Sequence, residues 1–133
     1  MATTTATLTL SSADLTSDAL SLSTSTTFTK ADTVTGLNQT SGVGRKTTSA
    51  TTQYTLFTAA NYTAAKAHKV YIKNTSNVAT EYLTLHVAAV EVGRIYAGDW
   101  TLIPFTAASG SDLKLTPSVA TELTVEYAIF IDA

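Results

Sequence analysis

The sequence predicts an all-β protein, folded as a single-domain β-sandwich or jelly roll of about eight short antiparallel strands. The first observation is the abundance of hydroxyl residues: 28 Thr and 12 Ser together make up 40 of the 133 residues. Thr is β-branched and favours the pleated surface of a strand, and its hydroxyl can face water in place of a charge. The second observation is that polar and apolar residues alternate through most of the chain, while no long segment has helical periodicity.

Length and charge narrow the possible classes of function. A chain of 133 residues fits one domain and can bury about two thirds of its unfolded surface. It has no Cys, so neither disulfides nor thiolate metal sites are available. Charged residues make up only 14% of the chain, the net charge is -2, and the basic residues are scattered, so we expect no nucleic-acid partner. There is no apolar run long enough to span a membrane and no leader pattern at the N-terminus, so we expect a soluble protein without a secretory signal.

The N-terminal region is expected to begin with an extended arm. Residues 6–10 (ATLTL) alternate strictly, and residues 1–10 are therefore predicted to form an arm or first strand that can add to the sheet of a neighbour. A disordered Ser/Thr-rich tail is the alternative for Met1 to Ala6. The single sandwich domain is then expected to cover residues 11–133, with a possible short helix at 11–20 capped by Ser12.

The middle of the chain reads as a long loop followed by strands. Residues 36–46 hold three of the six Gly and are predicted to be the most mobile loop. One helical turn is expected within residues 60–69. Strands are expected near residues 68–74, with Val70 and Ile72 on one face, and near residues 81–92, with Leu83, Leu85 and Val87 inward. We expect these two strands to pair as a hairpin.

Residues 93–105 (GRIYAGDWTLIPF) predict a tight turn between two strands. Gly98 tolerates positive φ and Asp99 can bond its own backbone, so the turn is placed at Ala97–Asp99. Pro104 cannot donate to a ladder, which predicts an edge strand or a strand end. For the single Trp, Trp100, we favour a lid over the core, with an aromatic anchor at a subunit interface as the alternative.

The C-terminal region contains the clearest strand pattern. Residues 109–112 predict a turn, and residues 113–115 a short strand. In residues 122–132 (ELTVEYAIFID) one face is apolar throughout and the other is partly apolar. This pattern is typical of a strand that is covered on both sides.

No residue pattern in the chain points to catalysis. His68 and His86 have no carboxylate at ligand spacing, and no nucleophile elbow, phosphate loop or calcium loop occurs. We therefore expect no enzyme activity, no metal and no cofactor.

Four segments carry a resemblance to a known class of proteins: VYIKNTS, YLTLHV, RIYAGDWTLIPF and LTVEYAIFIDA. In this order, between Gly42 and Ala133, they resemble small virion structural proteins of tailed bacteriophages, particularly cyanophage-like ones. The resemblance implies a non-enzymatic, self-assembling β-sandwich. The family includes capsid decoration (cement) proteins, head–tail components and fibre-tip domains.

Within that family we favour a capsid decoration protein, a homotrimer at local threefold positions of the shell. Its partners would be the major capsid protein and its own copies, with no nucleic acid and no membrane. Its location would be the virion surface, after a soluble stage in the host cytoplasm. Candidate interface residues come from the arm, the Gly-rich loop and the turn region: Thr5, Thr7, Leu8, Leu10, Leu37, Val43, Arg45, Tyr96 and Trp100.

Two alternatives remain open at this point. A head–tail or tail subunit would assemble as a larger ring. A receptor-binding or carbohydrate-binding fibre-tip module would need an exposed aromatic platform, for which the candidates are Tyr54, Tyr62, Tyr96 and Trp100.

Overall fold

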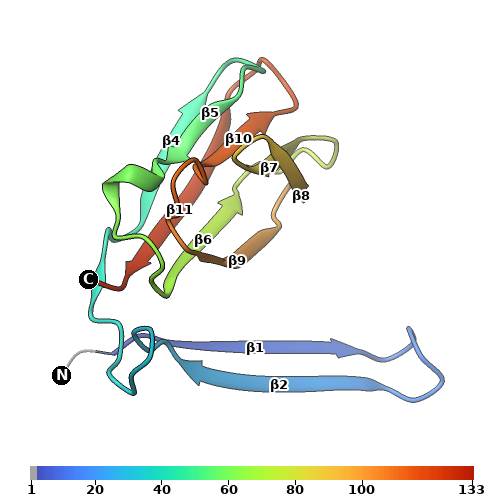
Figure 1. Cartoon of the computed structure of the whole chain (residues 1–133). Coiled ribbons are helices and arrows are strands. Elements are labelled where there is room, and N and C mark those ends of the chain that lie inside the picture. The colour runs from blue at the N-terminus through green and yellow to red at the C-terminus, as the bar shows by residue number, and fades with distance from the viewer. Residues whose placement is uncertain (1–2) are drawn as a thin grey trace.

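A computed structural model describes residues 3–133, which form eleven β-strands and a single 3-10 turn (Figure 1). The all-β prediction is confirmed, although the strands outnumber the eight or so expected. The elements in chain order are β1 (Thr5–Ser12), β2 (Leu20–Thr27), β3 (Gln39–Thr40), β4 (Gly44–Thr48), β5 (Tyr54–Phe57), η1 (Ala59–Asn61), β6 (His68–Asn74), β7 (Tyr82–Val87), β8 (Val90–Tyr96), β9 (Trp100–Phe105), β10 (Leu113–Pro117) and β11 (Leu123–Ile131).

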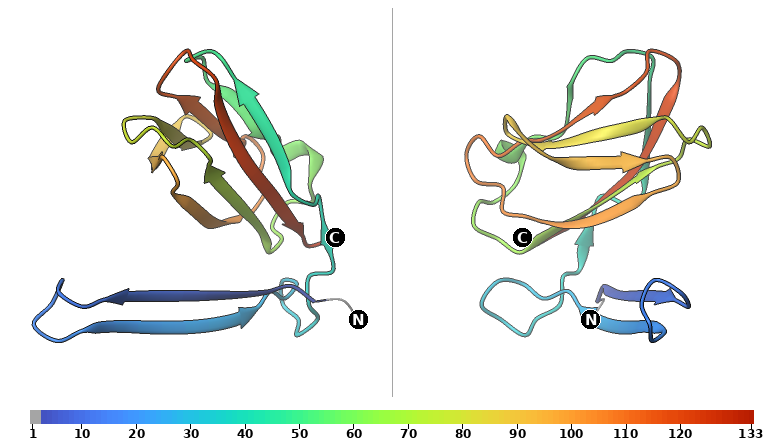
Figure 2. Two further views of the ribbon diagram at one scale, coloured as in Figure 1. Left: turned by 180° about the vertical axis from the view of Figure 1, so that it is seen from behind. Right: turned by 90° about the vertical axis from the view of Figure 1, so that its right-hand side faces the viewer.

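Two antiparallel sheets make the sandwich (Figure 2). One sheet has the order β5-β10-β7-β8, and the other has the order β3-β11-β6-β9, with β4 also paired to β11. β9 is thus an edge strand, as Pro104 predicts, and β11 is central, as its two apolar faces predict.

The core lies where the inward faces of both sheets meet. Val70 and Ile72 of β6 are fully buried, as is Leu83 of β7, while Leu85 is only 3% exposed. Each such side chain contributes about 1.5–3 kcal/mol relative to exposure to water. The alternation seen in the sequence therefore identifies the core face of these strands correctly.

The expected pairing of β6 with β7 is wrong, because the two strands lie in different sheets. β6 pairs with β9 and β11, whereas β7 pairs with β8 and β10. The buried Asn74 explains the change of sheet. Its side-chain Oδ1 accepts from the Ser76 N–H at 3.0 Å, and its Nδ2 donates to the Ile95 carbonyl of β8 at 3.1 Å. These bonds turn the chain away from β6 and join the two sheets at this end.

β1 and β2 form a separate two-stranded sheet, the N-terminal hairpin, which projects beside the sandwich (Figure 1). The pairing runs from Thr5 opposite Thr27 to Ser12 opposite Leu20. Of the two readings of residues 1–10, an arm or a first strand, the structure has a first strand, β1, which is paired along its length with β2. Met1 and Ala2 lie outside the described residues.

The short helix expected at residues 11–20 is also wrong. Ser12 Oγ does accept the Leu15 N–H at 3.1 Å, as a cap would, but the chain then bends and returns as β2. The segment is too short to hold a helix without tertiary packing, and its flanks pair as strands instead.

The Gly-rich segment 36–46 is not one continuous loop. It contains β3 and the start of β4, both of which pair with β11. Leu37 is fully buried and anchors the segment. Among residues 3–133, no helix has the length and apolarity needed to cross a membrane.

Candidate interaction surface at the N-terminal hairpin

One face of the N-terminal hairpin carries only hydroxyl side chains. Because side chains alternate along a strand, every second residue of β1 and β2 points to the same side. Across the pairing, Thr7 Oγ1 donates to Ser25 Oγ at 3.2 Å, and Thr5 and Thr27 hydroxyls lie 3.4 Å apart. We call this the hydroxyl face, made of Thr5, Thr7, Thr9, Ser11, Ser21, Ser23, Ser25 and Thr27.

The opposite face of the hairpin, which we call the apolar face, carries all of its apolar side chains, mixed with Ser12, Thr24 and Thr26. Its half nearer the sandwich consists of Ala6 and Leu8 opposite Thr26 and Thr24. Its other half, the distal apolar face, consists of Leu10, Leu20 and Leu22, which are 46%, 41% and 46% exposed. The hairpin is thus longer than the surface on which it packs, and its leucines extend beyond the sandwich.

The half nearer the sandwich packs on the outer face of the five-stranded sheet. Phe28, directly after β2, lies edge-on to Phe130 of β11 with ring centroids 5.7 Å apart. Beside this contact, a groove of about 360 Å³ separates the hairpin from β9. Leu8 lines it on the hairpin side, and Trp100 and Leu102 line it on the sheet side.

A buried carboxylate fixes the base of the hairpin to the sandwich. Asp132, just after β11, is fully buried, and its Oδ2 accepts the backbone N–H groups of Ala31 at 2.8 Å and Ala67 at 3.0 Å. The Asp132 N–H donates to Nδ1 of the fully buried His68 at 3.0 Å. Nδ1 must therefore be unprotonated, and Nε2–H donates to the Thr63 carbonyl at 2.9 Å.

The charge of Asp132 is stabilised by its donors. Burial raises the pKa of this carboxyl, but the N–H groups of Ala31 and Ala67, with Lys66 nearby, outweigh burial and hold the pKa below its ordinary value. Its Oδ1 atom is buried without a partner within residues 3–133. The site therefore depends on the two bonds at Oδ2.

Trp100 is not the expected lid over the core. Its side chain is 52% exposed on β9, at the edge of the sandwich. On the other side of Trp100 lies a second hollow of about 260 Å³, the edge groove, between the edge strands β8 and β9. Val92, 58% exposed on β8, lines this groove together with Ile95 and Ile103.

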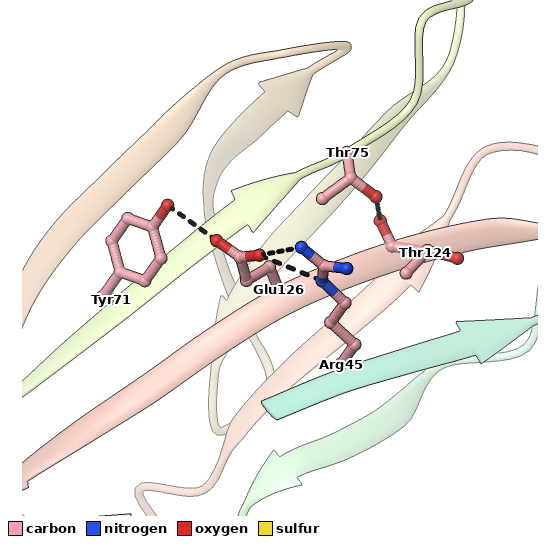
Figure 3. Close-up of polar contacts among 5 residues, drawn as sticks. All are labelled: Arg45, Tyr71, Thr75, Thr124 and Glu126. Atoms are coloured by element: carbon pink, nitrogen blue, oxygen red, sulfur yellow. Dashed lines mark hydrogen bonds and ion pairs between the residues drawn. The ribbon is translucent and has the colours of Figure 1, made fainter. Parts of the chain in front are cut away.

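A polar cluster occupies another part of the outer face of the five-stranded sheet (Figure 3). Arg45 Nη2 and Nε donate to Glu126 Oε2 at 2.8 and 3.0 Å, and the Tyr71 hydroxyl lies 3.4 Å from Oε1. The hydrogen bond from Arg45 lowers the pKa of Glu126. Nearby, the Thr75 hydroxyl donates to the Thr124 carbonyl at 2.8 Å. These bonds join β4, β11 and β6, and we assign the cluster a structural role.

The structure brings together some of the predicted interface residues. Thr5 and Thr7 lie on the hydroxyl face, and Leu8 and Leu10 on the apolar face. Val43 is 70% exposed in the β3–β4 connection, outside the hairpin. Arg45 is held in its ion pair. The prediction is wrong for Leu37, because a fully buried side chain is not available to a partner.

The four aromatic residues proposed as a glycan platform do not form one. Tyr54 and Tyr62 pack against the core, and burial, with Tyr127 adding to it, raises the pKa of Tyr54 to about 12. Tyr96 lies opposite Tyr82 on the four-stranded sheet, with ring centroids 5.2 Å apart, whereas Trp100 belongs to the other sheet.

Sequence reasoning missed Leu20, Leu22 and Val92 as exposed apolar residues, and Asp132 as the buried anchor of the hairpin base. A signal for the first two was present: residues 5–11 and 21–27 both place hydroxyls at every second position. Two strands that share such a face can pair so that all their hydroxyls lie on one side of the hairpin. Val92 and Asp132 had no comparable signal, because their roles depend on contacts distant in sequence.

Within the described part of the chain, no group of three His, Cys, Asp or Glu side chains is placed to hold a metal ion. Comparisons with family models, curated proteins and solved structures gave no match.

Proposed function

We propose that this chain is a structural subunit of a phage virion, a capsid decoration protein that binds the outer shell and stabilises it. The observation that carries the proposal is the N-terminal hairpin. It projects from the sandwich and bears no charge along either strand. The resemblance of residues 42–133 to phage virion proteins supplies the biological setting.

A hairpin of this kind is suited to binding. Two strands alone are marginally stable in water, and within residues 3–133 no further strand pairs with either edge of this sheet. An extended edge can be completed by a strand of another protein through main-chain hydrogen bonds. Contact with a partner would therefore order the hairpin and satisfy these groups together.

The hydroxyl face is the surface that we assign to the shell. Its side chains are exposed along both strands, whereas Ala6 and Leu8 of the other face are half-buried, and its hydroxyls can both donate and accept. An uncharged surface can be covered without the desolvation cost of a buried charge. It would also let many copies lie close together without repulsion.

The protein would act mechanically, by holding neighbouring shell subunits together. Each copy would add a modest contact between neighbouring shell subunits, and binding to the assembled shell alone would stabilise that state by mass action. Many such contacts would make the total effect large.

The test is co-sedimentation of purified protein with shells of the phage that encodes it, prepared without this protein. We expect saturable binding by the wild type and weaker binding by Thr9→Lys, which places a charge on the hydroxyl face. Thr121→Lys, at an exposed position before β11, is the matched control and should bind as the wild type does. Absence of wild-type binding would contradict the proposal, as would equal effects of the two variants.

The same experiment separates the alternatives. A head–tail subunit would bind at one vertex, with few copies per particle, instead of covering the shell. A glycan-binding tip is less favoured, because two of its four candidate aromatic residues, Tyr54 and Tyr62, pack against the core.

A further inference from the structure

We propose that the shell protein binds the N-terminal hairpin by adding an extended strand to the outer edge of β2. The inference rests on the proposed function and deepens it, because it names the edge, the pairing residues and the chemistry of the bound segment. The occupant to which we commit is an uncharged β-strand of a shell subunit, with apolar residues at alternate positions.

The edge of β2 lacks the features that normally prevent strand addition. Edge strands of folded proteins are protected by charged side chains, by Pro, by bulges or by short length. β2 is eight residues long, and its sequence LSLSTSTT contains no charged residue, no Pro and no Gly. Its pairing with β1 continues from Thr5 opposite Thr27 to Ser12 opposite Leu20 without a register shift. This edge is therefore a regular template for another strand.

The edge strands of the two sandwich sheets, within residues 3–133, each carry a protective feature. β3 has only two residues, and β5 has four, with a register shift in its pairing to β10. β4 contains Arg45 and Lys46, β8 contains Glu91 and Arg94, and β9 contains Pro104. The unprotected edges therefore belong to the hairpin.

Of the two hairpin strands, β2 has the more accessible edge. β1 is also uncharged, but it lies on the sandwich side of β2 (Figures 1 and 2), and its Ala6 and Leu8 are half-buried. All eight residues of β2 are exposed. A long strand can therefore follow β2 from end to end.

The pairing within the hairpin identifies the backbone groups that are open to a partner. The Phe28 N–H donates to the Thr4 carbonyl at 2.8 Å, so these two residues form a hydrogen-bonded pair of the ladder. Bonded and non-bonded pairs alternate along an antiparallel ladder. The residues of β2 that bond to β1 are therefore Leu20, Leu22, Thr24 and Thr26. The N–H and C=O groups that point to the outer edge belong to the residues between and after them: Ser21, Ser23, Ser25 and Thr27.

The same register defines the chemistry of the bound strand. Side chains of directly opposed residues lie on the same face of a sheet. Partner residues opposite Ser21 and Ser23 would lie on the hydroxyl face, and the residues between them would lie beside Leu20 and Leu22, which are 41% and 46% exposed. Apolar residues at these alternate positions would cover the two leucines. A charged residue there would find no opposite charge on β2.

The test replaces one outward N–H of β2 and measures co-sedimentation with shells prepared without this protein. Ser23→Pro removes that donor and places a ring at the edge, while the bonds from β2 to β1 stay in place, because Pro is tolerated where the N–H faces solvent. Ser23→Ala removes the hydroxyl alone and sets the baseline. We expect Ser23→Pro to bind at least about tenfold more weakly than Ser23→Ala. Ser21→Pro and Ser21→Ala form a second pair of variants near the start of β2.

NMR hydrogen exchange of the free protein tests the edge without shells. The amides of Leu22 and Thr24 should exchange slowly and those of Ser23 and Ser25 quickly. The slow exchange of Leu22 and Thr24 should persist in Ser23→Pro, which verifies that its hairpin is folded. Equal protection of both sets in the wild type would show that the edge is already paired, and would overturn the inference.

The outcomes separate this inference from the proposed function. If the wild type binds shells and each Pro variant with a folded hairpin binds as well as its Ala counterpart, strand addition at β2 is wrong while the proposed function stands. If the wild type does not bind shells, the proposed function is wrong and the inference falls with it.

Discussion

Replacing Asp132 by Ala should destabilise the fold markedly, because one buried oxygen accepts two backbone N–H groups. The substitution leaves the amides of Ala31 and Ala67 without their acceptor. Each backbone amide left without an acceptor lowers the free energy of unfolding by about 1–3 kcal/mol. Because both residues are half-buried, the lower part of this range applies. We expect a loss of about 3 kcal/mol in the free energy of unfolding, or a fall in Tm of roughly 10 °C for a chain of this size.

The assay is urea unfolding followed by the fluorescence of Trp100, with thermal unfolding as a second measure. Glu122→Ala is the control, since it removes a carboxylate from an exposed position near the start of the same strand. Its stability should lie within about 0.5 kcal/mol of the wild type. If Asp132→Ala were equally harmless, the assignment of Asp132 as the anchor of the hairpin base would be refuted.

The pH dependence of this contribution has a definite sign. The folded state holds the pKa of Asp132 below its ordinary value of 3.8, so the stabilisation is fully present above that value. It is lost as the pH falls through the lower, folded-state pKa. The stability difference between the wild type and Asp132→Asn should therefore be constant between about pH 5 and 7 and shrink below about pH 4.

Three further substitutions test separate parts of the structure. Gly44→Ala should lower the free energy of unfolding by about 1–3 kcal/mol, because a Cβ there would lie 2.9 Å from the ring of Tyr127. Urea unfolding measures this loss. Phe28→Ala should remove about 3 kcal/mol from hairpin docking, so the hairpin amides should exchange with solvent faster while the central strands of the sandwich keep their protection. Arg45→Ala should raise the pKa of Glu126, which loses its main hydrogen-bond donor; an NMR titration of that carboxylate would show no change if the ion pair were unimportant.

The fold class and the inward faces of the strands were predictable from the sequence, because they depend on local alternation. Val70, Ile72 and Leu83 were identified as core residues by parity alone, and all three are fully buried. Pro104 likewise predicted an edge strand through its missing N–H, and β9 is one.

Strand pairing was less predictable, because alternation does not specify which sheet a strand joins. The β6–β7 hairpin was expected from proximity in sequence, yet the side chain of Asn74 directs the chain across the sandwich. The same limit explains why Trp100 was wrongly expected to cover the core. An apolar residue on an edge strand reads as core in the sequence, and only its position on β9 shows that it is exposed.

The candidate surface was half predictable for a similar reason. Thr5, Thr7 and Leu10 were selected because the N-terminal segment is uncharged and prone to form strands. Leu20 and Leu22 could not be added to this surface without knowing that β2 pairs with β1. The groove near Val92 could not be predicted without knowing how the two sheets are placed.

The central claim is that the N-terminal hairpin is the element through which this protein binds the shell. The most direct measurement is hydrogen exchange of the full chain, free and bound to shells, followed peptide by peptide. We predict that binding will slow exchange throughout residues 5–27, since the edges of β1 and β2 gain partners, with smaller changes in the sandwich. Saturable binding with unchanged exchange in residues 5–27 and new protection elsewhere would contradict the account.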